Sequence, residues 1–264
     1  MNIEGSTILL TGASSGIGEA LAPLLSERGA TVGIAARRAD RLRATLARCK
    51  DHSPESRMWV ADLSDVHAAV QLVESAWTAF DGLDCLINNA AIGKRKLLVD
   101  HTPDDLETVM RTNFLSPIRM NLALLPKMLE RGSGTIVNVG SGGGRFGIAH
   151  ESAYCASKFA ITGWSEVAAM DLAGTPIEVK LIQPGAIATE IWIPQPGELP
   201  GLPGAEFATA TECATGIMEA LETDGFEFFV PPDLKAHVDY KNSDLKGWID
   251  LMVGLGQAKQ ATTS

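Results

Sequence analysis

The sequence has few of the residues that cross-link or bind metal in small domains. Its four cysteines lie at least 36 residues apart, at Cys49, Cys85, Cys155 and Cys213, which excludes a CxxC redox pair or a zinc knuckle. The five histidines are dispersed, without HxH or HxxxH spacing, so we expect no metal centre. Scattered cysteines are typical of a reduced, cytoplasmic protein.

Long hydrophobic runs and excess positive charge are also missing. The N-terminal run Ile8-Leu9-Leu10 is far too short for a signal-peptide core or a membrane span, so we expect no membrane partner. The balance of 22 basic against 32 acidic residues gives a net charge of −10, which disfavours a nucleic-acid partner. An anionic ligand must therefore be held by local positive charge. A hydrophobic content of 45% and a mean hydropathy of +0.09 indicate a globular protein.

The 264 residues suit a single α/β domain spanning 1–264. Short apolar, β-rich runs alternate with stretches of helical period. The strand candidates are Thr7–Leu10, Thr31–Ala35, Met58–Val60, Leu83–Asn88, Thr135–Val139, Ile177–Ile182 and Phe226–Val230. The helix candidates are Ile17–Arg28, Ala39–Cys49, Val66–Phe80, Pro103–Arg131, Ser152–Leu172 and Thr209–Leu221. This alternation predicts a Rossmann-type, doubly wound parallel sheet of seven strands with helices on both faces, whose ligands bind at the carboxyl ends of the strands.

Two segments stand apart from the alternation. The first, 185–208, follows a strand; the stretch Pro184–Gly204 carries five of the thirteen prolines and cannot be a regular helix or central strand. We expect a lid loop over the substrate, against the alternative of a functionless excursion. The second is a C-terminal extension, 232–264. Its apolar residues Leu245, Trp248, Ile249, Met252 and Val253 predict an amphipathic helix with Ser243 as N-cap, which packs on the core, closes a substrate pocket or forms a subunit contact.

The turn between the first strand and the first helix is rich in glycine. It reads Thr11-Gly-Ala-Ser-Ser-Gly-Ile-Gly18. Glycines let a backbone approach a pyrophosphate, and a helix N-terminus presents N–H groups and positive dipole to it. The turn predicts a phosphate site rather than a plain strand-to-helix turn.

Local positive charge follows the second strand. Residues 37–50 contain six basic side chains and one acid, a local charge of +5. The alanine before Arg37 cannot hydrogen-bond a ribose 2′-hydroxyl as an acid would there, whereas Arg37 can hold a 2′-phosphate. We expect Arg38, next to Arg37, to contact the cofactor as well. A solvated helix face is nevertheless the simpler explanation for Arg38, Arg41 and Arg43.

Tyr154 and Lys158 lie four residues apart, which on a helix places them on one face, about 6 Å apart along the axis. A nearby ammonium lowers the pKa of a tyrosine toward the range of an acid-base catalyst. Ser141 closes the fifth strand and precedes three glycines, so we expect it to hold a substrate oxygen as a hydrogen-bond donor rather than act as a nucleophile. Strand-end capping is the alternative for Ser141.

Two further strand ends carry polar or small residues. Asp62, followed by Leu63, could accept a hydrogen bond from an adenine amino group or cap the helix that follows; both roles are compatible. Asn89 and Ala90 end the fourth strand, where small side chains permit the close approach of a ribose or a flat ring.

These motifs together resemble the short-chain dehydrogenase/reductase family: TGxxxGxG at 11–18, NNA at 88–90, Asn113, Ser141, Tyr154-xxx-Lys158 and Pro184-Gly185, over about residues 5–230. The resemblance implies hydride transfer between NAD(P) and a carbonyl or alcohol. Tyr154 would exchange a proton with the substrate oxygen, Lys158 would lower the Tyr154 pKa and bond the nicotinamide ribose, Ser141 would fix the substrate, and Asn113 would help hold a proton-relaying water.

The resemblance also implies which residues contact the cofactor. They are Gly12, Ser14, Ser15 and Ile17 at the phosphates, Asp62 and Leu63 at the adenine, Asn89 and Ala90 at the ribose, and Pro184, Gly185, Ile187 and Thr189 beside the nicotinamide. With Arg37, the expectation is an NADP(H)-dependent ketone or aldehyde reductase for an apolar or bulky substrate. The alternatives are an NAD-dependent alcohol dehydrogenase and a non-catalytic NADP-binding sensor or scaffold.

Two departures from the family pattern bear on these expectations. Ala91 replaces the usual glycine after NNA, a small change. Pro231-Pro232 and the extension replace the usual glycine-containing ending, which ordinarily contributes to tetramer packing. We expect a homo-oligomer, with dimer and tetramer both open.

Overall fold

A computed structural model of the chain describes residues 1–201 and 206–261. Its main sheet has seven parallel strands in the order β3-β2-β1-β4-β5-β6-β9. The strands are β1 Thr7–Thr11, β2 Thr31–Ala36, β3 Arg57–Val60, β4 Cys85–Asn88, β5 Gly134–Val139, β6 Ile177–Pro184 and β9 Glu227–Val230. The predicted doubly wound fold is confirmed. Because the chain runs outward from β1 to β3 and then returns to β4, a ligand crevice is expected where β1 and β4 end.

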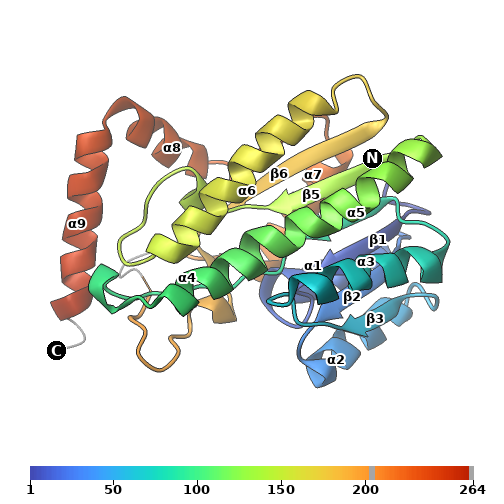
Figure 1. Cartoon of the computed structure of the whole chain (residues 1–264), viewed down its shortest axis with the longest axis horizontal. Coiled ribbons are helices and arrows are strands. Elements are labelled where there is room, and N and C mark those ends of the chain that lie inside the picture. The colour runs from blue at the N-terminus through green and yellow to red at the C-terminus, as the bar shows by residue number, and fades with distance from the viewer. Residues whose placement is uncertain (202–205, 262–264) are drawn as a thin grey trace.

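Helices cover both faces of the sheet (Figure 1). On one face lie α1 Gly16–Glu27, α2 Ala39–Lys50 and α7 Ala210–Glu222; on the other lie α3 Val66–Phe80, α4 Pro103–Met110, α5 Ser116–Arg131 and α6 Ser152–Asp171. In β1, Ile8 and Leu10 belong to one apolar cluster and Leu9 to the other. A central parallel strand buries both sides, which explains why its residues read as an unbroken apolar run.

The helix predicted at Pro103–Arg131 is interrupted. Between α4 and α5, Arg111–Leu115 form one wider, π-helical turn that contains Asn113. Pro117 has no N–H, so the carbonyl of Asn113, four residues earlier, lacks its α-helical partner. Such turns occur mostly at functional sites.

The segment 185–208 is partly ordered by a second, two-stranded sheet. β7 (Ile187–Ala188) pairs in parallel with β8 (Ala208–Thr209), and a short 3-10 helix, η4 (Glu190–Trp192), follows β7. Residues 202–205 of the predicted lid loop lie outside the described residues. Two other 3-10 turns are η1 (Leu98–Asp100) and η3 (Gly142–Gly144).

The C-terminal extension forms two helices where the sequence predicts one. α8 (Leu234–Ser243) and α9 (Leu245–Ala261) stand beyond the carboxyl ends of the strands, at the left of Figure 1. Asp244, not Ser243, caps α9, since its carboxylate accepts the Gly247 N–H at 2.8 Å. Positions 262–264 of the extension are outside the described residues. Within the described ranges, no helix is both long and apolar enough to cross a membrane.

Candidate active site

A cleft of about 1240 Å³ runs along the carboxyl ends of the central strands. It brings together nearly all the residues that the sequence predicts for the site. The predicted residues that line it are Gly12, Ser14, Ser15, Ile17, Arg37, Arg38, Asp62, Leu63, Asn89, Ala90, Ser141, Tyr154, Lys158, Pro184, Gly185, Ile187 and Thr189. The side chain of Asn113 is not among the lining groups.

The glycines of the first turn allow close packing as well as ligand approach. Gly12 has φ +74°, and a Cβ there would lie 2.8 Å from the Ala90 Cα. A Cβ at Gly18 would lie 2.5 Å from the Gly12 carbonyl oxygen. The turn between β1 and α1 is thus pressed against the end of β4.

Thr11, which we did not predict, ties the same two strand ends. Its hydroxyl accepts the N–H groups of Asn89 at 3.0 Å and Ala90 at 3.1 Å. Ser15 is the N-cap of α1, but its side chain makes no capping hydrogen bond. The N–H groups of the first turn are therefore free of a side-chain cap at the edge of the cleft, as an anion site requires.

The basic residues after β2 divide into two groups. Arg37 is exposed at the cleft. Arg38 and Arg41 both pair with Glu190, which comes from η4 in the 185–208 segment. All three of Arg38, Arg41 and Arg43 are exposed, as on a solvated helix face. Arg38 and Arg41 differ in that their acidic partner comes from far along the chain, whereas Arg43 pairs with the nearby Asp40.

Asp62 does not cap a helix. Its carboxylate accepts the Ser64 N–H at 2.9 Å in a turn, while Asp65 caps α3 by accepting the N–H groups of the next turn. Asp62 keeps a position on the cleft. Leu63 beside it is buried, and its carbonyl accepts the Ser116 hydroxyl at 2.7 Å, which joins this strand end to α5.

Tyr154 and Lys158 lie on the buried side of α6. The Lys158 ammonium donates to the Val139 carbonyl at 2.8 Å and lies 5.7 Å from the centre of the Tyr154 ring. Burial lowers the pKa of Lys158 to about 7. Burial also raises the pKa of Tyr154, opposed by the hydrogen bond with Ser141. Burial of the Tyr154 phenol therefore outweighs the lowering expected from Lys158, and the Tyr154 pKa rises instead.

Ser141 is held by Gln183, a residue that we did not predict. Gln183 lies fully buried in β6, and its side-chain carbonyl accepts the Ser141 N–H at 2.8 Å. The Ser141 hydroxyl accepts the Gly143 N–H at 3.1 Å, so the strand-end cap exists alongside the bond to Tyr154. The available signal was a polar side chain at the carboxyl end of β6, directly before Pro184.

Asn113 is buried next to the cleft rather than on it. Its amide oxygen accepts the Ile92 N–H at 2.9 Å, and its amide nitrogen donates to the Ile92 carbonyl at 2.9 Å and to the Ser157 hydroxyl at 3.0 Å. Ser157, also not predicted, donates in turn to the Tyr154 carbonyl at 2.7 Å. These hydrogen bonds therefore join the wide turn to the loop after β4 and to α6, the helix that carries Tyr154.

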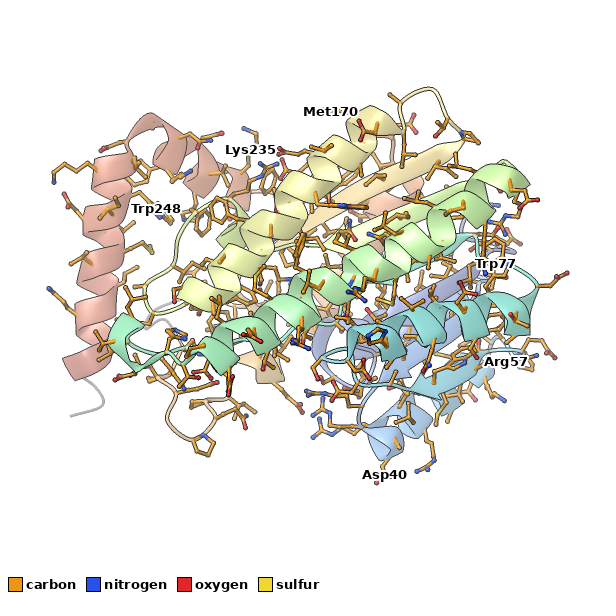
Figure 2. The ribbon with its side chains drawn as sticks, in the orientation of Figure 1. Asp40, Arg57, Trp77, Met170, Lys235 and Trp248 are labelled. Carbon is orange, nitrogen blue, oxygen red and sulfur yellow. The ribbon has the colours of Figure 1, made fainter. Side chains whose placement is uncertain are left out.

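The far end of the cleft is rich in apolar side chains, and the charged side chains of Lys94, Arg95, Glu198 and Asp233 line the cleft as well. Its walls come from the loop after β5, the 185–208 segment and the extension, with Phe146, Ile148, Ile191, Trp192, Leu234, Trp248, Leu251, Met252 and Leu255. Trp248 points from α9 toward the body of the protein (Figure 2); its ring centre lies 4.5 Å from that of Phe146, and its N–H donates to the Gly147 carbonyl at 3.0 Å. The extension thus closes the pocket, one of the roles that the sequence left open.

A buried arginine from the loop after β4 joins the 185–208 segment to this pocket. Arg95 is 2% exposed, lies 5.5 Å from the centre of the Trp192 ring and pairs with Glu198 at 3.8 Å. Its side chain donates to the Leu199 carbonyl at 3.3 Å. Neither Arg95 nor Glu198 was predicted, since nothing in their local sequence indicates burial.

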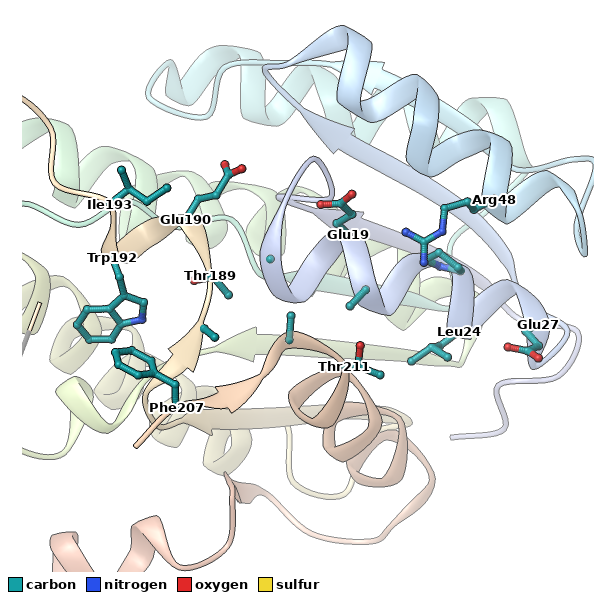
Figure 3. A pocket seen from close by; sticks show the side chains of 15 residues that line it. Glu19, Leu24, Glu27, Arg48, Thr189, Glu190, Trp192, Ile193, Phe207 and Thr211 are labelled. Carbon is teal, nitrogen blue, oxygen red and sulfur yellow. The ribbon is translucent and has the colours of Figure 1, made fainter. Parts of the chain in front are cut away.

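A second hollow, of about 800 Å³, lies against the outer side of α1 (Figure 3). None of Ser141, Tyr154 and Lys158 lines it, so the reactive groups belong to the larger cleft. In the part of the chain that the structure describes, no group of three or more His, Cys, Asp or Glu side chains could hold a metal ion.

A crevice at the reversal of a doubly wound sheet, with a buried tyrosine and lysine at its inner end, defines a dinucleotide-dependent oxidoreductase. The chain matches the short chain dehydrogenase family over residues 6–198, and it belongs to that family. It is 30% identical over 229 residues to the ketoacyl reductase HetN of Nostoc sp., a match that covers 86% of this chain and 79% of that protein.

Two solved structures share the fold. A short-chain dehydrogenase from Sphingobium yanoikuyae in complex with NADPH is 28% identical with a TM-score of 0.79, covering 93% of this chain and 95% of that one. A short chain dehydrogenase/reductase from Burkholderia phymatum in complex with NAD is 24% identical with a TM-score of 0.84, covering 93% of this chain and 96% of that one; at this identity it shows the fold alone.

Proposed function

We propose that the protein is an NADP(H)-dependent reductase of a ketone or aldehyde whose carbonyl carries an apolar or bulky group. The observation that carries this proposal is the position of Tyr154. Its hydroxyl is hydrogen-bonded to Ser141 where the dinucleotide cleft meets the apolar pocket. A substrate carbonyl placed there has a proton donor beside it and an apolar wall beyond it.

The residues of the cleft fit a dinucleotide. The uncapped first turn of α1 and the close approach at Gly12 suit a pyrophosphate, and Arg37 and Arg38 suit a 2′-phosphate. Asp62 and Leu63 would hold the adenine, Asn89 and Ala90 the ribose, and the residues after β6 the nicotinamide. The nicotinamide, when bound, supplies or accepts the hydride.

In this mechanism Ser141 and Tyr154 donate hydrogen bonds to the carbonyl oxygen, and Tyr154 transfers its proton as hydride arrives at the carbon. The Tyr154 phenol is protonated at neutral pH, which is the form that donates a proton during reduction. Lys158, held by the Val139 carbonyl, stabilises the phenolate as it forms and bonds the ribose. The Asn113 carbonyl of the wide turn would hold a water that returns the proton.

The substrate proposal rests on the walls contributed by the extension and by the 185–208 segment, which we propose acts as a lid. Ring contacts join Phe146 to Trp248 and Trp192 to Phe207. The name of the Nostoc relative, a ketoacyl reductase, agrees with a ketone next to an apolar chain. A non-catalytic sensor is the weaker candidate, since Ser141, Tyr154 and Lys158 all face the cleft.

The test is coenzyme oxidation measured with NADPH and with NADH across 3-oxoacyl thioesters, aromatic and aliphatic ketones, aldehydes and small sugars. We expect turnover of apolar ketones with NADPH, and a loss of the preference for NADPH in Arg37→Ala. Turnover of sugars alone would overturn the substrate proposal. A selectivity between NADPH and NADH that Arg37→Ala leaves unchanged would overturn the phosphate assignment.

We also propose that the protein is a homo-oligomer that works in a reducing, cytoplasmic setting. Exposed apolar side chains gather on α5 and α6, among them Leu122, Val167 and Met170, and a second copy of the chain would cover them. The setting is supported by four cysteines that are all unpaired and buried.

A further inference from the structure

Glu190 joins the 185–208 segment to the basic helix α2. It is the first residue of η4, directly after Thr189. One carboxylate oxygen accepts a hydrogen bond from Arg38 at 2.6 Å, and the other accepts one from Arg41. A single carboxylate therefore bridges two guanidinium groups. The bonds from Arg41 and Arg38 hold the pKa of Glu190 below its ordinary value, so it is ionised at neutral pH.

One of the two bridged arginines, Arg38, borders the phosphate turn, and Arg41 lies outside the lining of the cleft. Arg38 also donates to the Ser14 hydroxyl at 3.3 Å and to the Ser14 carbonyl at 3.4 Å. Arg38 and Ser14 both line the dinucleotide cleft. Arg38 follows the end of β2, where we expect the ribose of the adenosine half to lie. Two guanidinium groups that bind both oxygens of a carboxylate can bind the oxygens of a phosphate monoester in the same way, through positive charge and paired N–H donors.

The segment that carries Glu190 runs close over the phosphate turn. A Cβ at Gly16 would lie 2.8 Å from the methyl carbon of Thr189, so this part of the segment has little room to move inward. Figure 3 shows Thr189 and Glu190 side by side, with Glu190 extended away from Trp192 and Phe207. Glu190 therefore reaches the arginines from the same short helix that supplies Trp192 to the substrate end of the cleft.

We propose that Glu190 determines cofactor specificity by competing with the 2′-phosphate of NADP(H) for Arg38 and Arg41. NADP(H) displaces the carboxylate from the two arginines, whereas NAD(H), which lacks the phosphate, leaves the bridge in place. Arg37 takes no part in the bridge, so it is the first cation that the incoming phosphate contacts. The inference rests on the proposed use of NADP(H). Because Glu190 competes with the 2′-phosphate, the wild-type protein prefers NADP(H) over NAD(H) less strongly than the local positive charge alone would predict.

The test compares Glu190→Gln with the wild-type chain. Dissociation constants for NADP⁺, NAD⁺ and 2′,5′-ADP are measured by isothermal titration calorimetry. Glu190→Gln removes the competing charge from an exposed position, so it folds normally, which circular dichroism checks. We expect it to bind NADP⁺ and 2′,5′-ADP about three- to tenfold more tightly, with the NAD⁺ constant changed less than about twofold.

Two matched controls distinguish the direct contact of Glu190 with the arginines from a general effect of removing a negative charge. Glu19→Gln removes a carboxylate that acts on Arg41 through charge but makes no hydrogen bond to it, and Glu222→Gln removes the partner of Arg28 on the remote surface. We expect a smaller gain in NADP⁺ affinity from the first control and none from the second. An unchanged ratio of NADP⁺ to NAD⁺ affinity in Glu190→Gln, an equal gain for both cofactors, or a full-sized gain in Glu19→Gln would each overturn the inference.

The outcomes also separate this inference from the proposed function. A wild-type protein that prefers NAD⁺ would overturn the proposed cofactor preference, yet a rise in the affinity ratio in Glu190→Gln would still support the competition. A wild-type protein that binds neither cofactor would overturn both.

Discussion

Asn113 pairs with the backbone of Ile92 as if it were a neighbouring strand residue, accepting its N–H and donating to its carbonyl, both at 2.9 Å. The side chain thereby satisfies a loop residue that has no strand partner. It also leaves the Asn113 main chain in the wide turn, where Pro117 cannot donate to its carbonyl. The pairing fixes the loop after β4 at the inner end of the cleft.

We predict that Asn113→Ala lowers the free energy of unfolding by about 2–4 kcal/mol, because the Ile92 N–H and carbonyl and the Ser157 hydroxyl lose a buried partner. Urea denaturation measures the change. The matched control is Asn242→Ala, at an exposed position in α8, which should change stability by less than about 0.5 kcal/mol. Equal effects of the two substitutions would contradict the structural role of Asn113.

The chain has two tyrosines, which provide a matched pair for catalysis. Tyr154→Phe should lower kcat about 10²- to 10⁴-fold, since it removes the proton donor but keeps the ring. Its dissociation constant for NADPH should stay within about twofold of wild type, because the lost hydroxyl faces the substrate oxygen. Tyr240→Phe, on the exposed side of α8, should leave kcat unchanged. Steady-state kinetics and cofactor titration check both; full activity in Tyr154→Phe would refute the mechanism.

Lys158 makes the stability of the unliganded protein depend on pH. Its pKa is about 7 when folded and has the ordinary value of 10.5 when unfolded, so between these values the unfolded chain binds the extra proton. The contribution of Lys158 to stability must therefore rise with pH across this window. Lys158→Met should abolish turnover, remove this slope and raise the free energy of unfolding at pH 7 by roughly 1–3 kcal/mol.

Denaturation at several pH values between about 7 and 8 measures the Lys158 effect. The window stops there because burial raises the pKa of all four cysteines and of Tyr154, and these groups add slopes of the opposite sign as pH approaches their ordinary values. Lys246→Met, at an exposed position of α9, is the control and should keep the wild-type slope. A slope retained by Lys158→Met would assign the pH dependence to another group.

Trp248 should affect the substrate and not the cofactor. Trp248→Ala removes the wall against Phe146, so the KM for a bulky ketone should rise about tenfold or more, while the Kd for NADPH stays the same. Trp77→Ala is the control; Trp77 lies on α3, away from the extension (Figure 2). A KM that does not change with Trp248→Ala would remove the extension from the substrate pocket.

Leu122 tests the proposed oligomer. Leu122→Glu places a charge in the apolar face of α5 and should lower the molar mass measured by light scattering toward that of one chain. Val99→Glu, at an exposed apolar side chain away from α5 and α6, should leave the mass unchanged. A wild-type chain that is already monomeric would refute the proposal outright.

The sequence predicts those parts of the site that depend on patterns of neighbouring residues. Buried parallel strands need continuous apolar runs, and the residues directly after them, such as Ser141 and Asn89, meet at one edge because the topology leaves no other place for them. The glycine turn is likewise visible, since glycine adopts the left-handed conformation found at Gly12 without steric cost.

The rest depends on partners that lie far apart in the chain. Glu190 meets Arg38 across 152 residues, and Gln183 meets Ser141 across 42, with no periodicity to indicate either contact. The wide turn at Asn113 is hidden inside a segment with helical spacing. The direction of the Tyr154 pKa shift depends on how deeply Tyr154 itself is buried, and spacing alone gives no measure of burial.

The two helices after β9 give the molecule a modular organisation. The residues proposed for cofactor binding and proton transfer all precede residue 190, while α8 and α9 contribute Leu234, Trp248 and Met252 to the outer wall of the pocket. An exchange of this C-terminal module between related chains at Val230 would change the shape offered to the substrate and keep the reactive machinery intact. The extension is thus the natural place to engineer a new substrate range on an unchanged catalyst.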